Sequence, residues 1–159
     1  MRLFTVLVAV SALLISSACL KSKSEQQPSA KIDPTGYFTI KGKAPRELSE
    51  IDWIAINPEN PKPEVAPDSN WGSKFPHGCL RLKNGTRIKY DQFLIRGNSL
   101  ELRTAPNKGT TYSFKGQFGP EKAFDDVQKD LSALTGTMTK TSNGATTQFG
   151  IEFFWFNGD

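Results

Sequence analysis

The feature that most constrains the fold is a series of short alternating apolar runs from residue 75 to the end of the chain, separated by glycine and asparagine turns. Residues that lie opposite each other in a hairpin share a face of the sheet, so each turn must keep apolar side chains together. A two-residue Asn84-Gly85 turn would place apolar residues opposite charged ones. A three-residue loop over 83–85, with Gly85 left-handed, pairs Leu80 with Ile88 and satisfies the pattern.

Three later hairpins follow the same rule. The expected pairs are Ile95 with Leu100 across Gly97-Asn98, Leu102 with Tyr112 across a five-residue connection at 105–109, and Met138 with Phe149 across Asn143-Gly144. Phe93 and Ile95 have the opposite parity to Ile88 and Tyr90, so we expect a β-bulge near Asp91-Gln92 that keeps all four pointing inward.

The remaining elements are less regular. Residues 36–40 favour an extended segment with Phe38 and Ile40 on one face, and a strand is expected from about Ile51, although Pro45 suits the start of a short helix. Residues 57–73 contain four prolines and are expected to form a long loop. A short helix is predicted at about 120–131, where Phe124, Val127 and Leu131 form one stripe that would cap an open end of the sheet.

Together these elements predict an all-β domain, a small antiparallel up-and-down barrel or curled meander of about eight strands, with the shape seen in lipocalins and avidins. Its bulky inward residues favour an interior filled by side chains over a ligand cavity. The residues expected to point inward are Phe38, Ile40, Leu80, Leu82, Ile88, Tyr90, Phe93, Ile95, Leu100, Leu102, Tyr112, Phe114, Phe118, Leu134, Met138, Phe149, Ile151, Phe153 and Trp155.

The first eighteen residues are predicted to be a signal peptide. A positive start at Arg2 is followed by an apolar run over 3–15, which is shorter than the about 20 residues that a permanent membrane helix needs. The stretch from Ile15 to Cys19 resembles the lipobox of bacterial lipoproteins. That resemblance implies cleavage after Ala18, acylation of the Cys19 thiol with chains such as palmitate, and attachment to a membrane of the bacterial cell envelope, with the outer membrane favoured.

The alternative is an ordinary signal peptidase site, which would leave Cys19 unacylated and the protein secreted. The chain has two cysteines, so acylation of Cys19 leaves Cys79 without an intramolecular partner, whereas an unacylated Cys19 permits a disulfide. Residues 19–34 have the polar composition of a disordered tether, and residues 35–159 are expected to form the β domain.

Composition and charge disfavour several functions. The formal net charge is +4, with the basic residues dispersed along the sequence, so nucleic acid is not an expected partner. With a single histidine the chain shows no catalytic motif, and we expect neither an enzyme nor a cofactor. His77 and Cys79 are spaced to permit a metal pair, but a surface histidine beside a covered thiol is the favoured interpretation.

The candidate binding residues are aromatic. If Phe153 and Trp155 face inward, then Phe154 and Phe156 face outward and form an interaction patch, unless the predicted helix covers them. Trp71, at the end of the long loop, either folds back over the core or contacts a ligand. These residues predict a non-catalytic envelope lipoprotein whose β domain binds an envelope protein or a small apolar ligand.

The C-terminal stretch suggests an alternative function. Residues 143–145, 150–151, 154–155 and 158–159 resemble part of the periplasmic and membrane-bound inhibitors of c-type lysozyme, which are small β-barrel lipoproteins. The resemblance implies inhibition of a hydrolase such as lysozyme. Thr147 and Asn157 depart from the pattern of that family, and the chain ends where the family continues with another strand.

Overall fold

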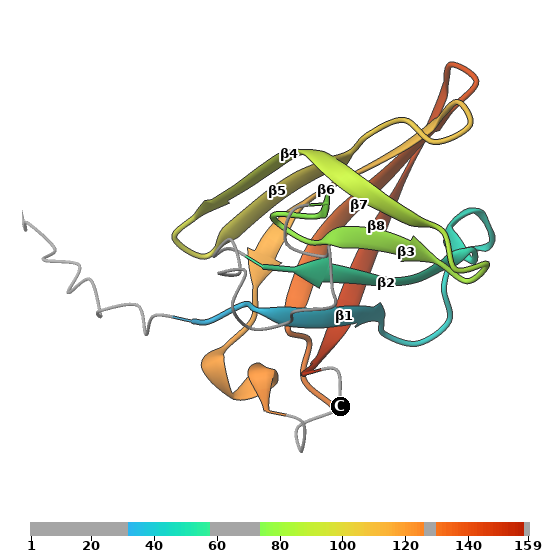
Figure 1. The fold of residues 1–159 in the computed structure, drawn as a ribbon. Helices are drawn as coiled ribbons and strands as arrows, with labels where there is room; N and C mark the ends of the chain where they lie inside the picture. The colour runs from blue at the N-terminus through green and yellow to red at the C-terminus, as the bar shows by residue number, and fades with distance from the viewer. Residues whose placement is uncertain (1–31, 58–73, 126–129, 158–159) are drawn as a thin grey trace, which may run out of the picture.

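The computed structural model describes residues 32–57, 74–125 and 130–157 and shows a closed antiparallel barrel of eight strands (Figure 1). The strands are β1 (Gly36–Ile40), β2 (Ile51–Ile56), β3 (Cys79–Leu82), β4 (Arg87–Arg96), β5 (Ser99–Thr104), β6 (Thr110–Phe118), β7 (Leu134–Ser142) and β8 (Ala145–Phe156). Each strand pairs with its neighbours in sequence, and β1 closes the barrel by pairing with β8. The expected all-β, up-and-down barrel is confirmed.

Three of the four predicted hairpin registers are confirmed. Leu80 pairs with Ile88, Ile95 with Leu100, and Met138 with Phe149. Gly85 has a φ of 85°, the left-handed conformation that the three-residue loop requires. The register between β4 and β5 shifts between Tyr90 and Gln92, which confirms the expected bulge.

The predicted register of the β5–β6 hairpin is wrong by two residues. Leu102 pairs with Phe114, not with Tyr112. The turn is a two-residue one, in which Lys108 and Gly109 have φ values of 48° and 77°, as a type I′ turn requires. Because the error is an even number of residues, the same side chains still point into the barrel.

The prediction of a helix at about 120–131 is also wrong. Its first turn is a 3-10 helix, η3 (Glu121–Phe124), which Asp125 ends in an extended conformation; residues 126–129, including Val127, lie outside the described part. Phe124 does cover one end of the barrel, because its ring lies 6.2 Å from that of Phe38 and 6.1 Å from that of Phe118. A second 3-10 helix, η1 (Arg46–Leu48), precedes β2, so the helical turn and the strand weighed for that region both form.

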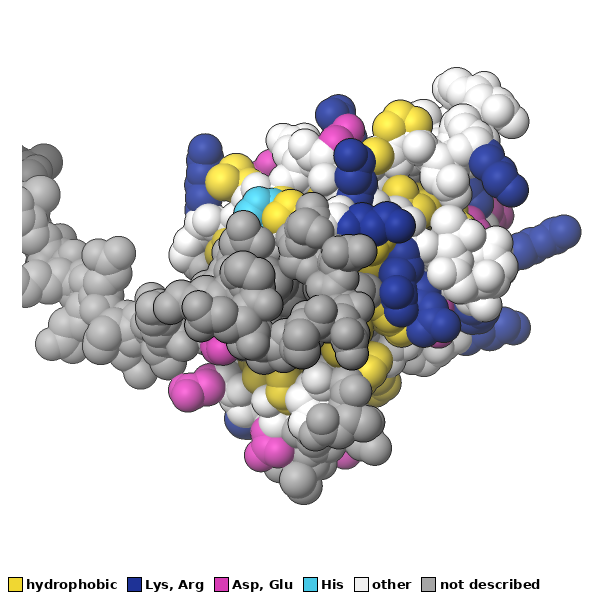
Figure 2. All heavy atoms as spheres, in the orientation of Figure 1, with side chains coloured by type: hydrophobic (Ala, Val, Ile, Leu, Met, Phe, Trp, Pro, Cys, Tyr) yellow, Lys and Arg dark blue, Asp and Glu magenta, His cyan; other side chains and the backbone are white. Residues whose placement is uncertain are grey.

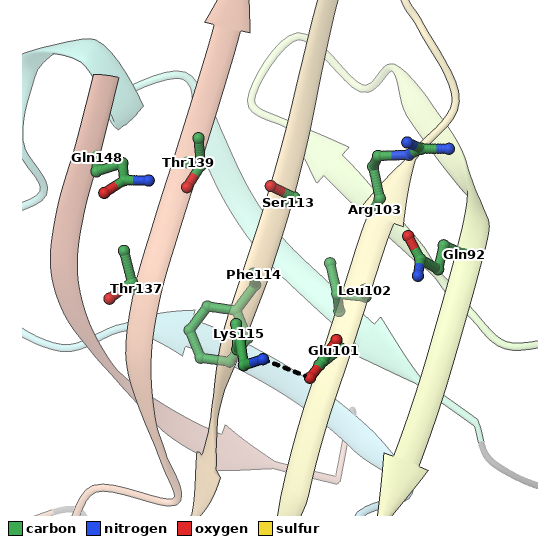
Figure 3. Close-up of a pocket in the computed structure, with 10 residues that line it drawn as sticks. All are labelled: Gln92, Glu101, Leu102, Arg103, Ser113, Phe114, Lys115, Thr137, Thr139 and Gln148. Carbon is green, nitrogen blue, oxygen red and sulfur yellow. Dashed lines mark ion pairs between the residues drawn. The ribbon is translucent and has the colours of Figure 1, made fainter. Parts of the chain in front are cut away.

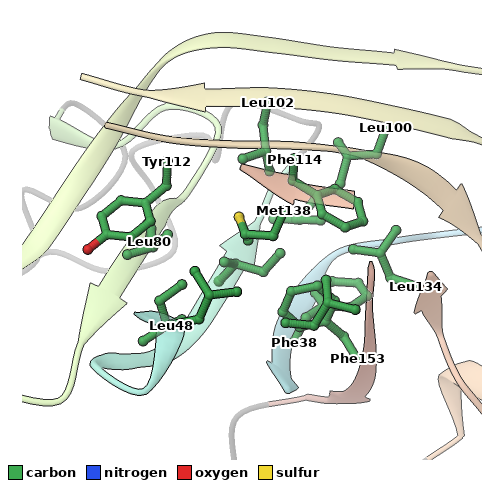
Figure 4. Close-up of a cluster of buried hydrophobic side chains, with 14 of the residues drawn as sticks. Phe38, Leu48, Leu80, Leu100, Leu102, Tyr112, Phe114, Leu134, Met138 and Phe153 are labelled. Atoms are coloured by element: carbon green, nitrogen blue, oxygen red, sulfur yellow. The ribbon is translucent and has the colours of Figure 1, made fainter. Parts of the chain in front are cut away.

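All the side chains that were expected to point inward belong to one hydrophobic cluster or pack against it (Figure 4). Bulky side chains such as Phe38, Phe114 and Phe153 are fully buried and occupy the interior of the barrel. The cluster also contains Leu48 of η1 and Ile54 of β2, which the turn pattern did not assign. All eight strands and this cluster lie within residues 36–156, so the barrel contains its own core.

Candidate interaction surfaces

Of the five residues singled out from the sequence, Ala18, Cys19 and Trp71 lie outside the described residues, and the predictions on them stay predictions. Phe154 and Phe156 are half-buried on the outer face of β8, opposite Thr39 and Tyr37 of β1. Their outward direction follows from alternation along β8, in which the neighbouring Phe153 is fully buried in the core. The covering alternative does not match the contacts of η3, whose Phe124 packs on aromatic rings of the inner face.

Three outward aromatic rings lie side by side across β8, β1 and β2. The rings of Phe156 and Tyr37 are stacked at 5.3 Å between centroids, and Tyr37 meets Trp53 edge-on at 4.8 Å. We call Phe156, Tyr37 and Trp53 the aromatic row. Ile51 and Ile54 both point inward although they are three residues apart, because β2 has a bulge between Ile51 and Trp53. The extra residue leaves Trp53, directly before Ile54, pointing outward.

Cations lie over two outward rings, Trp53 of the aromatic row and Phe154 of β8. The guanidinium of Arg81 on β3 lies 5.5 Å from the Trp53 ring, and the Arg81 Nε lies 3.6 Å from a carboxylate oxygen of Asp52. The Lys41 Nζ lies 5.4 Å from the ring of Phe154. Both cations are within the range of a cation–π interaction, so each is held over an aromatic face as well as beside a carboxylate.

The carboxylate beside Lys41 belongs to Glu152. Ser132 donates a short hydrogen bond to Glu152, and the Lys41 Nζ lies 3.6 Å from the same carboxylate. These hydrogen bonds and the nearby charge lower the pKa of Glu152. Lys41 also donates to the carbonyl of Asp130 at 2.8 Å, so its position beside Phe154 is fixed from two sides.

A polar groove of about 490 Å³ lies over the outer faces of β4 to β8 (Figure 3). Its floor consists of small side chains such as Ser113, Thr137 and Thr139, and glutamine amides stand at its two edges. It is lined by Gln92, Glu101, Leu102, Arg103, Ser113, Phe114, Lys115, Thr137, Thr139 and Gln148. A second concavity of about 390 Å³ adjoins it through Glu101 and Lys115. We call these two concavities the polar groove.

Two cations that line the polar groove, Lys115 and Arg103, are paired with carboxylates. The Lys115 Nζ lies 2.8 Å from a Glu101 carboxylate oxygen, and this hydrogen bond and charge lower the pKa of Glu101. The Arg103 Nε donates to Asp91 at 3.0 Å, which raises the pKa of Arg103 further. A ligand in this groove would therefore meet hydrogen-bonding groups and neutralised ion pairs.

The aromatic row and the polar groove lie on opposite sides of the barrel. In a closed ring of eight strands, three strands lie between β2 and β6 in either direction. The row is centred on β1 and β2, and the groove on β5, β6 and β7.

An ion-pair network closes the barrel end near η1. Glu50 accepts hydrogen bonds from the Tyr112 hydroxyl at 2.7 Å and from the Lys140 Nζ at 2.5 Å. Burial raises the pKa of Glu50, but the hydrogen bonds from Lys140 and Tyr112 outweigh it and leave the pKa lowered. Lys140 also donates to the carbonyl of Glu47 at 2.8 Å, so the network ties η1 to β6 and β7.

His77 and Cys79, which are spaced to permit a metal pair, lie in different environments. Cys79 is fully buried, and burial raises the pKa of its thiol to about 12 despite the nearby Arg87 and Arg81. His77 is exposed and stacks on Phe93 at 5.0 Å. No group of three or more potential metal-ligating side chains is present in the described ranges.

The sequence interpretation missed Tyr37, Trp53 and the polar groove. The outward direction of Tyr37 could have been predicted, because side chains alternate along a strand and Phe38 and Ile40 were placed inward. Trp53 depended on the bulge in β2, for which the sequence has no glycine or proline signal. The polar groove combines residues from five strands, which only the closed barrel brings together.

Comparison of the chain with protein-family models, with curated proteins and with solved structures finds no match. The function must therefore be inferred from the surfaces themselves. Among the helices of the described part, none has the length and apolar character needed to cross a membrane.

Proposed function

We propose that this chain is an exported lipoprotein of the bacterial envelope, acylated on Cys19, whose barrel is a non-catalytic domain that binds a protein partner. The export signal, the lipobox-like stretch and the tether composition of residues 19–34 support the attachment. If Cys19 is not acylated, the same barrel is secreted.

The observation that carries the binding role is the contrast between a filled interior and an open polar groove. Phe38, Phe114 and Phe153 occupy the space that a small apolar ligand would need. The polar groove instead offers hydroxyl and amide groups over five strands of a rigid barrel. A binding surface of this kind suits a polar protein segment better than an apolar small molecule.

Two further features support a non-catalytic role. The Cys79 thiol remains protonated at neutral pH because of its raised pKa, so it is a poor nucleophile. In the polar groove, Glu101 and Asp91 neutralise Lys115 and Arg103. Neither arrangement presents an activated acid, base or nucleophile.

Intact-mass measurement tests the attachment. We expect the mature protein to begin at Cys19 and to carry the added mass of acyl chains, and the Cys19→Ser variant to lack that mass and leave the membrane fraction. A mature protein that begins at Cys19 without added mass would refute acylation and leave the secreted form.

Site-specific photocrosslinking in the living cell tests the binding surface. A photoreactive residue at Thr137, in the floor of the polar groove, is expected to yield one protein adduct of discrete mass. The control is the same residue at Lys122, which is exposed on η3 outside the groove. A Gln148→Arg substitution at the groove edge should abolish the Thr137 adduct. Equal labelling at Thr137 and Lys122 would refute a partner in the groove.

Inhibition of a hydrolase such as c-type lysozyme is a second candidate. The observation that favours it is the exposed tip of the β7–β8 hairpin, in which Asn143 and Gly144 form a two-residue turn that projects from the barrel (Figure 1). A projecting turn of this kind can enter an active-site cleft. Absence of inhibition at micromolar protein would remove this candidate and would leave the binding role unaffected.

A further inference from the structure

We propose that an open edge of β8 pairs with the same edge of a second copy of this chain, so that two barrels form a dimer through one continuous sheet. The two β8 strands run antiparallel, and the two-fold axis passes through Gln148. The inference goes beyond the proposed function, and it depends neither on acylation of Cys19 nor on the identity of a partner in the polar groove.

The first half of β8 has a neighbouring strand on one side only. β7 pairs with β8 over residues 145–153, whereas β1 pairs with it only over residues 153–156. The last hydrogen bond on the β1 side runs from the Lys41 N–H to the Glu152 carbonyl. Among the described residues, no strand pairs with residues 145–151 on that side. We call this stretch the free edge.

Two independent observations show which backbone groups point to the free edge. Along a strand these groups alternate between the two sides, and the Glu152 carbonyl bonds to Lys41 on the β1 side, so even-numbered residues face that side. The two-residue turn at 143–144 makes Ala145 a hydrogen-bonded partner of Ser142, which directs odd-numbered residues to β7. The N–H and C=O groups that point to the free edge are those of Thr146, Gln148 and Gly150.

These backbone groups are accessible to a partner. Thr146, Gln148 and Gly150 are all exposed, and the exposed surface of a glycine is backbone. A Cβ atom on Gly150 would meet nothing within 4 Å. Backbone N–H and C=O groups are strong hydrogen-bonding groups, and an unpaired row of them is a template for another strand.

The free edge has none of the residues that usually prevent strand pairing. Natural proteins protect such edges with charged side chains, lysine above all, and with proline. Residues 145–151 read Ala-Thr-Thr-Gln-Phe-Gly-Ile, without a charge or a proline. In Figure 2 the end of the β7–β8 hairpin projects at the upper right as polar side chains and backbone, with no charged group at its tip. The edge is therefore open to pairing.

The free edge is complementary to itself. With Gln148 on the axis, Thr146 lies opposite Gly150 of the second copy, so the threonine faces a residue without a side chain. Each of the three residue pairs along the edge can exchange two main-chain hydrogen bonds. The edge is uncharged, so two copies meet without repulsion, whereas a charged peptide would find no opposite charge on it. A two-fold contact uses the same edge in both copies and closes, which gives a dimer and not a fibre.

The position of β1 selects this register. With Gln148 on the axis, Gly144 of one copy lies opposite Glu152 of the other, where Lys41 ends the free edge. A shift of two residues one way would place Thr146 of the second copy at Glu152 and displace Lys41. A shift of two residues the other way would lose one of the three hydrogen-bonded pairs. The proposed register is therefore the longest pairing that leaves β1 in place.

A concavity lies where the free edge ends. It has a volume of about 510 Å³ and lies between residues 150–152 of β8 and residues 41–45. In the proposed register the turn at 143–144 of the second copy reaches Glu152 and so enters this concavity. Lys43, which lines it, is exposed, and its ammonium can donate to the carbonyl groups of the incoming turn. The contact between the copies therefore extends beyond the two strands.

Dimerisation brings the two polar grooves together. Gln148 lines the polar groove at its β8 edge. Outward side chains of paired strands lie on the same face of a sheet, so the outer faces of β7 and β8 from both copies form one surface. Two copies of the surface that we propose for a protein partner then lie side by side.

Cysteine crosslinking tests the register in the mature chain from residue 19 with Cys19→Ser, whose native thiol, Cys79, is buried. The Cα atoms of a hydrogen-bonded antiparallel pair lie about 5.5 Å apart, within the range of a disulfide. Gln148→Cys should therefore form a disulfide-linked dimer on mild oxidation. Thr146→Cys or Gly150→Cys alone should not, because each is displaced from its own copy by about 13 Å along the strand. Mixing these two proteins should give a linked heterodimer.

Sedimentation equilibrium at micromolar to millimolar concentrations measures the association. Gln148→Lys places two ammonium groups opposite each other on the axis and should raise the dissociation constant about fivefold. The matched control is Thr137→Lys, which adds the same charge to an exposed outward position one strand away and should leave the constant unchanged. Mixing Gln148→Lys with Gln148→Glu should restore association as a heterodimer, which a role of Gln148 in folding alone would not produce. Circular dichroism of each variant establishes that the barrel is folded.

Three results would overturn the inference. These are a parent protein that stays monomeric at millimolar concentration, equal weakening by Gln148→Lys and Thr137→Lys, and crosslinking of Thr146→Cys alone that matches that of Gln148→Cys. In the cell, a Gln148→Cys adduct with the mass of two chains supports the dimer, and an adduct with a different polypeptide overturns it in favour of strand addition by that protein. A barrel that dimerises but yields no Thr137 adduct refutes only the proposed partner in the polar groove.

Discussion

Replacing Gly136 by alanine should destabilise the barrel, because an inward glycine pair makes room for an aromatic ring. Gly136 of β7 pairs with Gly116 of β6, and the ring of Phe114 folds over both. A Cβ atom on Gly136 would lie 2.5 Å from the Gly116 Cα and 2.7 Å from the Phe114 Cζ, and it would also meet the carbonyl oxygen of Lys115. Normal carbon contacts are about 3.5–4.0 Å.

Two of these three obstacles are backbone atoms of the neighbouring strand, which cannot move without breaking the β6–β7 pairing. Overpacking a core in this way costs about 1–3 kcal/mol, and we expect a value in the upper half of that range. Gly150→Ala provides the control, since Gly150 is exposed on β8 and a Cβ there meets nothing within 4 Å. That substitution should stabilise the protein by about 0.4–1 kcal/mol through the entropy of the unfolded chain.

Urea denaturation of the two variants and the parent, followed by circular dichroism, measures both effects. A difference of 1 kcal/mol corresponds to about 4 °C in the melting temperature of a domain this size, so thermal melts give an independent value. If the unfolding free energy of Gly136→Ala were within about 0.5 kcal/mol of the parent, or above it as expected for Gly150→Ala, the Phe114 ring would be shown to relax freely. That result would refute the reasoning.

Other measurements test single groups. The lowered pKa of Glu50 contributes stability that is present above its unfolded pKa of about 4.3 and is lost as the pH falls through the folded value. Glu50→Gln should therefore cost about 1 kcal/mol at pH 7, after allowing for solvent screening, and the difference from the parent should vanish in urea titrations near pH 3; a gap that persists at pH 3 would contradict the role of the charge. The buried Cys79 thiol, with its pKa of about 12, should resist a thiol reagent at pH 8 in the folded protein and react within minutes in urea, and rapid labelling without urea would disprove its burial.

Much of the barrel was predictable from local patterns. A two-residue turn at Asn143-Gly144 requires Met138 to pair with Phe149, and the structure has this pair. The bulge between Tyr90 and Gln92 followed from a change of parity within one strand. The β5–β6 register failed because the turn has two residues, with Lys108 at a positive φ that a lysine seldom adopts, and because the pairing shifts by one residue between Asn107 and Arg103.

The surfaces were less accessible to sequence reasoning. The outward direction of Phe154 and Phe156 followed from alternation along β8, but their neighbours Tyr37 and Trp53 belong to strands more than a hundred residues away. The predicted helix beyond Pro120 ends after one 3-10 turn. A stripe of apolar residues does not stabilise a helix where only a few of its side chains can be buried.

The sequence by itself determined the strands, most of the turns and which side chains point into the barrel, because alternation and turn geometry are properties of neighbouring residues. Only the tertiary structure decided what lies on the outside. Closure of β1 on β8 brings the two ends of the domain together and creates the aromatic row, and the coiling of β4 to β8 creates the polar groove. Both depend on contacts between distant strands, which the ring of hydrogen bonds specifies and local periodicity does not.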